Sequence, residues 1–366
     1  MKKTLVAIAA LASVTAFAQT TATITGVFDS SFANQKTTYG DAAVRSQNAL
    51  FNSQQGTSQI NFALSEDLGG GLKAIANLEQ DFNVNSKTDV ANLGAASNIV
   101  AGNSSTLGGQ TFVGLEGGFG TIKMGAQNTP SLAVAAGRTP FGTKLGSGFS
   151  DGTSTGLGIQ GLGHVRESNS VEYSTPVVGG FQLRANLTNA TAAFAVNNYN
   201  QTAALAAANA KRDVGVSYTN GPVSAMIVNY KQNEQYNQVH GFVKYALGDA
   251  TVAYGFSNDS RLAAQTAATT DGSEKIALVV GTLASTNIAA TYQMGATTWM
   301  ANYARLDDKG TTNYDSKITA FGAKYDLSKR TSAYGRYVKS TVNNTNSQAV
   351  QVKEQATTLL GLMHTF

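Results

Sequence analysis

Cysteine is absent from the 366 residues, and proline occurs only 4 times. Small secreted domains commonly depend on disulfides, so an exported chain without cysteine must take its stability from hydrogen bonding and packing. Charge is scarce as well, because Asp, Glu, Lys and Arg make up 13% of the chain, against about 25% in soluble chains. The 26 basic and 22 acidic residues are too nearly balanced for a nucleic-acid-binding protein, and we exclude that class of partner.

Long hydrophobic runs are also lacking, since a helix that crosses a bilayer takes roughly 20 apolar residues. One run of about 12 residues, Leu5–Ala16, follows two lysines and ends at Ala16-Phe17-Ala18, a small-x-small site for signal peptidase. We therefore predict that residues 1–18 are a signal peptide and that the mature chain begins at Gln19. The run is too short to span a bilayer, so it is a targeting segment and not an anchor.

Glycine and aromatic residues are abundant, with 38 Gly, 16 Phe and 14 Tyr, and the mean hydropathy is near zero. This combination is unusual for a soluble protein with so few charges. A closed membrane barrel explains it, because an apolar outer face and a polar inner face average to near neutrality.

Apolar and polar residues alternate with a period of two, which is typical of strands with one face in an apolar environment. In Phe181–Thr188, apolar side chains at the odd positions alternate with polar ones at the even positions. Leu72–Phe82 and Gln59–Ser65 follow the same pattern. The period of two therefore predicts strands and not helices along the chain.

Tight turns rich in Gly, Asn or Asp join these strands in pairs. They lie at residues 67–70, 117–120, 178–180, 220–222, 247–249, 294–296 and 326–329. Seven hairpins give fourteen strands, and a first strand at Thr23–Ser31 with a last at Val352–Phe366 makes sixteen. Longer polar stretches, such as Asn34–Gln55, connect the hairpins at the other end.

This pattern predicts an all-β fold, a sixteen-stranded antiparallel transmembrane β-barrel over residues 19–366. Lipid offers no hydrogen-bond partner, so an open sheet would leave the groups at its edges unsatisfied, and closure removes the edges. A soluble β-sandwich also alternates, but it would not normally need seven hairpins before an aromatic C-terminus.

The longest stretch without a strand pattern covers residues 128–165, and a loop of this length is usually functional. It carries Pro130, Pro140 and apolar groups, such as Phe141 and Leu157–Leu162, that are unsuited to an exposed loop. We predict that this third loop folds inward against the barrel wall and constricts the channel. The alternative is an exposed surface loop.

Charged side chains on the strands should face the lumen, because a charge that faces lipid at the midplane costs about 2 to 4 kcal/mol. Side chains of a strand point alternately to its two faces, and the positions that alternate with the apolar residues should face the lumen. The charges expected there are Lys73, Glu79, Asp81, Lys123, Glu172, Arg184 and Arg336. Arg138, Lys144 and Asp151 lie in the predicted constriction loop, and Arg166 follows it. Any of these charges could also lie far from the constriction, where water and salt screen it over roughly 8 Å.

Several stretches resemble signatures of the general bacterial porins of Gram-negative outer membranes, most closely the beta-proteobacterial branch. They are Ser65–Ala74, Phe112–Leu115, Phe119–Thr121, Asn169–Tyr173 with Pro176 and Gly180-Phe181, Tyr325–Thr331, and Gly361–Phe366. The resemblance runs from the second strand to the last and implies a homotrimer of water-filled pores in outer-membrane lipids. It also implies that the barrel-assembly machinery reads the terminal Phe366.

In such porins, acidic groups on the third loop face a basic cluster on the wall, and Arg166 is similar to one member of that cluster. This chain departs from the pattern, because Gln59, Ala63 and Ala126 stand where the family has basic residues. Its loop carries one carboxylate, Asp151. We therefore predict passive diffusion of small hydrophilic solutes and ions, with a weak preference for anions.

Two other functions compete with a channel. An enzyme needs a nucleophile with a positioned base, and the histidines, His164, His240 and His364, suggest neither such a pair nor a metal cluster. We expect no catalysis and no cofactor. The stronger alternative is an adhesin or structural barrel with a plugged lumen and partner-binding external loops.

Overall fold

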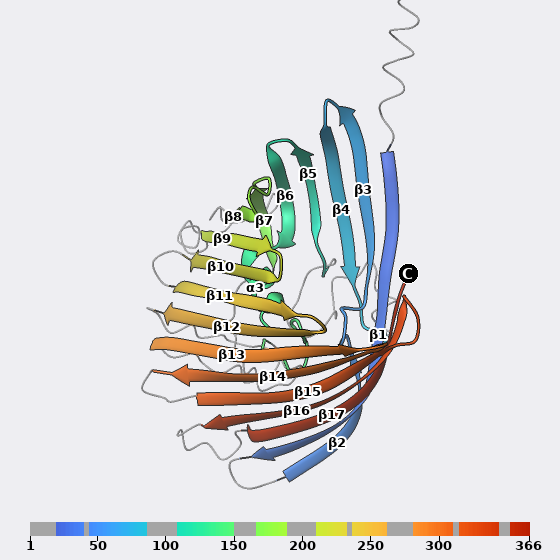
Figure 1. Ribbon diagram of the computed structural model, residues 1–366, viewed down its shortest axis with the longest axis vertical. Helices are drawn as coiled ribbons and strands as arrows, with labels where there is room; N and C mark the ends of the chain where they lie inside the picture. The colour runs from blue at the N-terminus through green and yellow to red at the C-terminus, as the bar shows by residue number, and fades with distance from the viewer. Residues whose placement is uncertain are drawn as a thin grey trace, which may run out of the picture.

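The computed structural model describes residues 20–39, 44–85, 108–149, 166–188, 210–232, 236–261, 281–309, 315–343 and 352–366. They form one antiparallel sheet and a short helix, α3 (Pro130–Gly137) (Figure 1). In this part of the chain, no helix has the length and hydrophobicity needed to cross a membrane. The predicted signal peptide, Asp151 and His164 lie outside the described residues.

The sheet contains 17 strand segments. They are β1 (Thr20–Tyr39), β2 (Val44–Asn52), β3 (Gln59–Gly69), β4 (Leu72–Asp81), β5 (Thr111–Gly117), β6 (Gly120–Asn128), β7 (Arg166–Ser174), β8 (Phe181–Thr188), β9 (Lys211–Asn220), β10 (Val223–Gln232), β11 (Tyr236–Leu247), β12 (Ala250–Arg261), β13 (Gly281–Met294), β14 (Thr297–Asp308), β15 (Asp315–Asp326), β16 (Thr331–Asn343) and β17 (Val352–Thr365).

The ring closes through β1, which pairs with β17 on one side and with β3 on the other, while β3 to β17 pair in sequence order. β2 continues the line of β3: it pairs with Ser30–Thr38 of β1, whereas β3 pairs with Thr20–Val27. β1 together with β3 to β17 makes sixteen strands around the ring, which confirms the predicted barrel.

The prediction that Asn34–Gln55 is a connecting loop is wrong for most of its residues. β1 continues to Tyr39, and β2 occupies Val44–Asn52. In this part of β1, buried Gln35 and Thr37 alternate with exposed Asn34 and Lys36, so both faces are polar. The strand remains, but the alternation of apolar and polar residues that signals a strand is lost.

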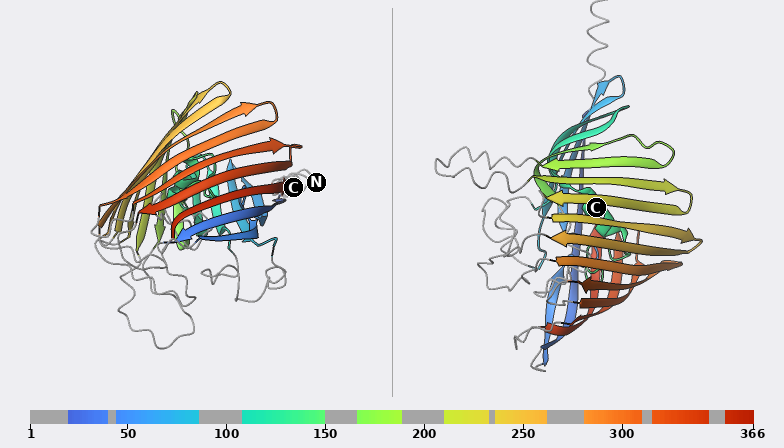
Figure 2. Two further views of the ribbon diagram at one scale, coloured as in Figure 1. Left: turned by 90° about the horizontal axis from the view of Figure 1, so that it is seen from below. Right: turned by 90° about the vertical axis from the view of Figure 1, so that its left-hand side faces the viewer.

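All seven predicted turns lie between paired strands, from Gly69–Leu72 to Asp326–Thr331. Gly221, Gly248 and Gly295 have φ between 54° and 59°, the left-handed conformation that two-residue hairpin turns require and that glycine adopts without strain. The turns join neighbouring strands at one end of the barrel, and Figure 2 shows the wall of neighbouring strands from two further directions.

Strand residues alternate between an exposed apolar face and a buried polar face. Met124, Val171 and Leu183 are exposed on β6, β7 and β8, whereas Glu172 and Asn186 are buried on the opposite face of the same sheet. An apolar outside and a polar inside are the arrangement of a barrel that stands in lipid and holds water.

Candidate functional site

Helix α3 lies against the inner face of the wall, in contact with β8 to β11. Thr129 caps it by accepting a hydrogen bond from Leu132 N at 3.2 Å, and Pro130 occupies the first turn, where its missing N–H costs nothing. Ser131 N donates to the Asp213 carboxylate at 3.0 Å, and the Ser131 hydroxyl lies 3.1 Å from His240 Nε2. These bonds fix the helix to β9 and β11.

Arg138 follows the helix and has no exposed surface. Its Nε donates to Asn287 Oδ1 at 2.8 Å, and Asn287 Nδ2 donates back to Arg138 O at 2.8 Å. Burial lowers the pKa of Arg138 to about 10, so the guanidinium remains protonated at neutral pH. Gly255 gives it room, because a Cβ there would lie 2.5 Å from Arg138 Nε.

Residues 139–149 continue along the inner wall toward β16. Phe141 and Leu145 belong to a buried apolar cluster with inward-facing side chains of the strands. Asn302 Nδ2 donates to Gly146 O at 2.9 Å, and Arg336 donates to Leu145 O at 2.9 Å. The described part of the predicted third loop is thus bound to the wall; constriction of the channel by the whole segment 128–165 stays a prediction.

This apolar cluster was missed by the sequence analysis. Ile318, Ala320 and Val338 point inward and are buried under residues 141–146. The prediction assigned the apolar residues of each strand to the lipid-facing side and the polar residues to the water-facing side. It therefore could not identify apolar residues that face inward. Phe141, which is unsuited to an exposed loop, was the one hint.

Arg166 lies at the centre of an ion-pair cluster on the inner face. Its Nη2 lies 3.1 Å from Glu79 Oε1, and its Nη1 lies 3.2 Å from Asp81 Oδ2. Gln59 donates to Glu79 Oε2 at 3.2 Å. The structure therefore brings three of the predicted lumenal charges together, with the acids on β4 and the base at the start of β7.

A second cluster centres on Glu172, which is almost fully buried. Arg184 Nη2 donates to both of its carboxylate oxygens, at 2.9 and 3.0 Å, and Lys123 Nζ lies 4.0 Å away. Lys73 lies apart from these clusters near a tight turn, half-exposed, 3.8 Å from Glu116.

The inner-face charges that were not among the predicted site residues include Asp29, Glu167, Lys211, Asp213 and Asp259. Lys211 pairs with Glu167 at 2.8 Å, and Asp213 holds α3. Lys211 and Asp213 fall in a stretch that reads as a polar loop. Asp29 could have been found by parity, since it directly follows the outward Phe28.

Arg138, Lys144 and Arg336 differ from the cations in these clusters. Their hydrogen bonds go to neutral oxygens: Asn287 for Arg138, the Thr57 hydroxyl at 2.7 Å for Lys144, and Leu145 O for Arg336. Among the described residues, none of the three has a carboxylate within ion-pair distance.

Lys144 gives the site a predicted pH dependence. Burial lowers the pKa of Lys144, and the carboxylates of Asp81 and Asp29 only partly oppose this effect. We expect the predicted preference for anions to fall as pH rises through this lowered pKa, before an ordinary lysine, with a pKa of about 10.4, loses its proton. Reversal potentials measured between neutral pH and pH about 10 will show this fall, and the fall should be smaller in Lys144→Met. The same pH dependence in both proteins would contradict the assignment.

The two described histidines lie on opposite faces of the barrel wall. His240 is buried on the inner face beside Ser131, and His364 lies exposed at the outer face, 2.9 Å from the Thr331 hydroxyl. The described side chains contain no group of three or more His, Asp or Glu residues placed to hold a metal ion.

A closed barrel with an apolar outer face and a charged inner face belongs to the class of outer-membrane channels. The profile of the Gram-negative porin family matches residues 4–345. The sequence is 30% identical to outer membrane porin protein 32 of Delftia acidovorans, over 96% of this chain and 93% of that protein. This chain therefore belongs to the Gram-negative porin family.

Further relatives agree with this assignment. An outer membrane porin protein of Bordetella pertussis is 28% identical, over 93% of this chain and 95% of its own. Among solved structures, the fold matches an anion-selective porin from Comamonas acidovorans with a TM-score of 0.69 and 20% identity, over 95% of this chain and 100% of that one. The protein is an outer-membrane channel for small hydrophilic solutes, and the comparisons do not support the adhesin alternative.

Proposed function

We propose that this porin passes small hydrophilic solutes and ions by passive diffusion with a weak preference for anions. One observation carries the proposal: the acids in the clusters around Arg166, Glu172 and Glu167 are paired with bases, whereas Arg138, Lys144 and Arg336 bond to neutral oxygens. A unit charge about 8 Å from a permeating ion contributes roughly 0.5 kcal/mol in water, a factor of about two in local concentration. Screening by salt keeps the preference weak.

Reversal potentials in a planar bilayer under a salt gradient test this selectivity. Arg166→Ala leaves Glu79 and Asp81 without their cation, so the anion-to-cation permeability ratio should fall by about twofold. Glu172→Gln removes the carboxylate beside Arg184, so the ratio should rise by about the same factor.

Arg212→Gln is the matched control for both variants. It removes an exposed cation on the outer face of β9, and the reversal potential should stay at the wild-type value. Clear cation preference in the wild type would refute the proposal, as would shifts of the same sign in Arg166→Ala and Glu172→Gln.

We also propose that the exported chain begins at Gln19, assembles as a homotrimer and is recognised by the barrel-assembly machinery through Phe366. One structural neighbour, an outer membrane protein of Vibrio cholerae, was solved in a trimer form, which supports this assembly by analogy. N-terminal sequencing of the mature protein and native mass determination test the first two points. Deleting Phe366 and following insertion into the outer membrane tests the third.

The protein is proposed to act only as a channel, without catalysis or a cofactor. The matching family and the named relatives are porins, which supports this proposal. Turnover of ester or peptide substrates by the purified barrel would overturn it.

A further inference from the structure

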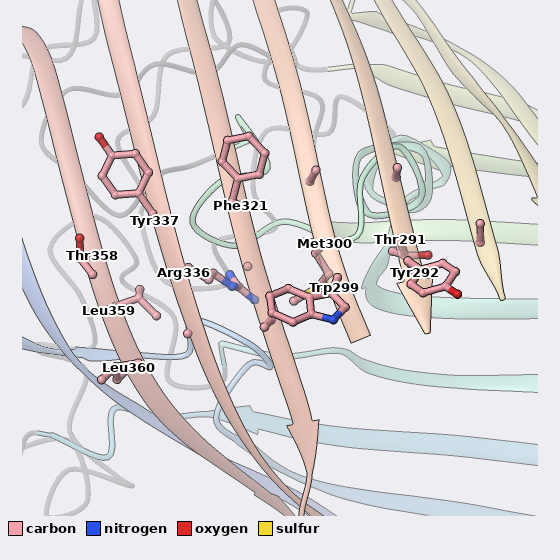
Figure 3. A pocket seen from close by; sticks show the side chains of 16 residues that line it. Thr291, Tyr292, Trp299, Met300, Phe321, Arg336, Tyr337, Thr358, Leu359 and Leu360 are labelled. Carbon is pink, nitrogen blue, oxygen red and sulfur yellow. The ribbon is translucent and has the colours of Figure 1, made fainter. Parts of the chain in front are cut away.

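The outer face of β13 to β17 carries a hollow of about 720 Å³. Its lining includes the rings of Trp299, Phe321 and Tyr337, which Figure 3 shows on neighbouring strands. The hollow exists because small residues stand opposite the large ones: Ala301 faces Phe321, and Ala323 faces Trp299. These side chains are on the outer face of the barrel, so in the outer membrane the hollow opens toward lipid.

Two cations lie on the same face, farther along the same strands. Arg305 on β14 and Lys317 on β15 are directly opposite each other and both exposed. Like charges placed opposite each other destabilise a sheet, and among the described residues neither cation makes an ion pair. Two acids, Asp307 and Asp315, lie two residues nearer the strand ends.

A third cation borders the pair. Lys339 on β16 lies opposite Thr319 and forms an ion pair with Glu354 at 3.0 Å. The three bases stand at the end of the strands away from the tight turns, which is the extracellular side of an outer-membrane barrel.

The three bases, Arg305, Lys317 and Lys339, lie close enough to the hollow for one lipid molecule to contact both. Arg305 is four residues from Ala301 and six from Trp299, which corresponds to about 13 and 20 Å along the strand. A fatty acyl chain attached to a headgroup at the cations can reach the hollow over this distance. An acyl chain would fill the apolar space, and a phosphate would neutralise the opposed cations.

We propose that Arg305, Lys317 and Lys339 together with this hollow form a binding site for a phosphorylated glycolipid of the outer leaflet. The cations hold the phosphate, and one acyl chain lies between Trp299 and Tyr337. The site is on the outside of the barrel and is independent of the proposed ion selectivity.

Trp299 makes the proposal measurable, because it is the only tryptophan in the chain and lines the hollow. In detergent micelles that contain phosphatidylcholine with brominated acyl chains, the bromine quenches Trp299 emission. Lipids without bromine that enter the hollow displace the brominated lipid and restore the emission. Diphosphoryl lipid A should do so at a mole fraction at least about tenfold lower than the mole fraction of unbrominated phosphatidylcholine that has the same effect.

The double variant Arg305→Ala/Lys317→Ala should raise the required mole fraction of lipid A about 25-fold, the product of about fivefold for each lost cation. The matched control is Arg212→Ala/Lys231→Ala, which removes another pair of outer-face bases opposed across β9 and β10. It should respond like the wild type. Ala323→Leu, which fills the hollow, should weaken displacement by lipid A while leaving the single-channel conductance unchanged.

Four results would overturn the proposal. Lipid A and plain phosphatidylcholine could displace the brominated lipid equally, or both double variants could weaken binding to the same extent. Inorganic phosphate alone could restore the emission, which would show that the signal reports an anion and not an acyl chain. Finally, brominated lipid could fail to quench Trp299 at all, because a second copy of the chain covers this face.

Discussion

Replacing Asp29 with alanine is expected to lower the free energy of unfolding by about 3–5 kcal/mol, because it leaves one buried and two partly buried donors without an acceptor, each worth about 1–3 kcal/mol. Asp29 has no exposed surface. Its Oδ2 accepts from the backbone N–H groups of Gln55 and Gly56, and its Oδ1 accepts from the Tyr334 hydroxyl. The Asp29 carboxylate on β1 thus binds both the segment between β2 and β3 and Tyr334 of β16.

The measurement is urea unfolding of the barrel refolded into lipid vesicles, followed by Trp299 fluorescence and extrapolated to zero urea. Tyr334→Phe removes one of the three bonds and should cost about 1–2 kcal/mol. Ser30→Ala is the control, since the neighbouring Ser30 hydroxyl bonds only to exposed Asn85 among the described partners, and its loss should cost under about 0.5 kcal/mol. Equal losses in all three proteins would show that Asp29 has no special role.

Gly255→Val should release residues 138–149 from the wall. A Cβ at Gly255 would lie 2.3 Å from Asn287 Oδ1 and 2.5 Å from Arg138 Nε, so the bonds between Asn287 and Arg138 cannot persist. We expect a stability loss of about 1–3 kcal/mol from overpacking. We also expect a lower and noisier single-channel conductance, because the released segment then occupies the lumen.

Arg138→Met separates the position of the segment from its charge. Methionine keeps much of the side-chain volume and removes a buried cation that has no carboxylate partner, so folding stability should be kept or improved. The conductance should remain quiet, because Asn287 Nδ2 can still donate to the backbone oxygen of residue 138, while the anion preference falls. A quiet, wild-type conductance in Gly255→Val would instead show that the contacts between Asn287 and residue 138 do not hold the segment in place.

The alternation of side chains predicted the barrel well where one face meets lipid. The predicted strand at Phe181–Thr188 matches β8, and the prediction of Leu72–Phe82 is one residue longer than β4. The alternation did not predict the strands within Asn34–Gln55, because the end of β1 and much of β2 carry polar side chains on both faces. An alternation of apolar and polar residues shows that one face of a strand meets an apolar environment. A strand with polar side chains on both faces lacks this alternation.

The inner wall was predictable only in part. Parity selects charges such as Glu172 and Arg184 one at a time, but which cation meets which carboxylate depends on strand register and on the route of the third loop. Arg166 illustrates this limit. It follows the loop in sequence, yet its partners, Glu79 and Asp81, lie on β4, more than eighty residues earlier.

The junction between β1 and β17 has a consequence for the order of folding. Gly26 and Phe366 exchange two backbone hydrogen bonds of 3.1 Å, so the ring is joined by two residues that lie 340 positions apart in the sequence (366 − 26). Contacts between such distant parts of a chain form slowly. Until they form, β1 and β17 each present unpaired N–H and C=O groups that invite aggregation. Closure of this barrel therefore has to wait until β17 has been synthesised, and until then the edges of β1 and β17 must be kept away from other chains.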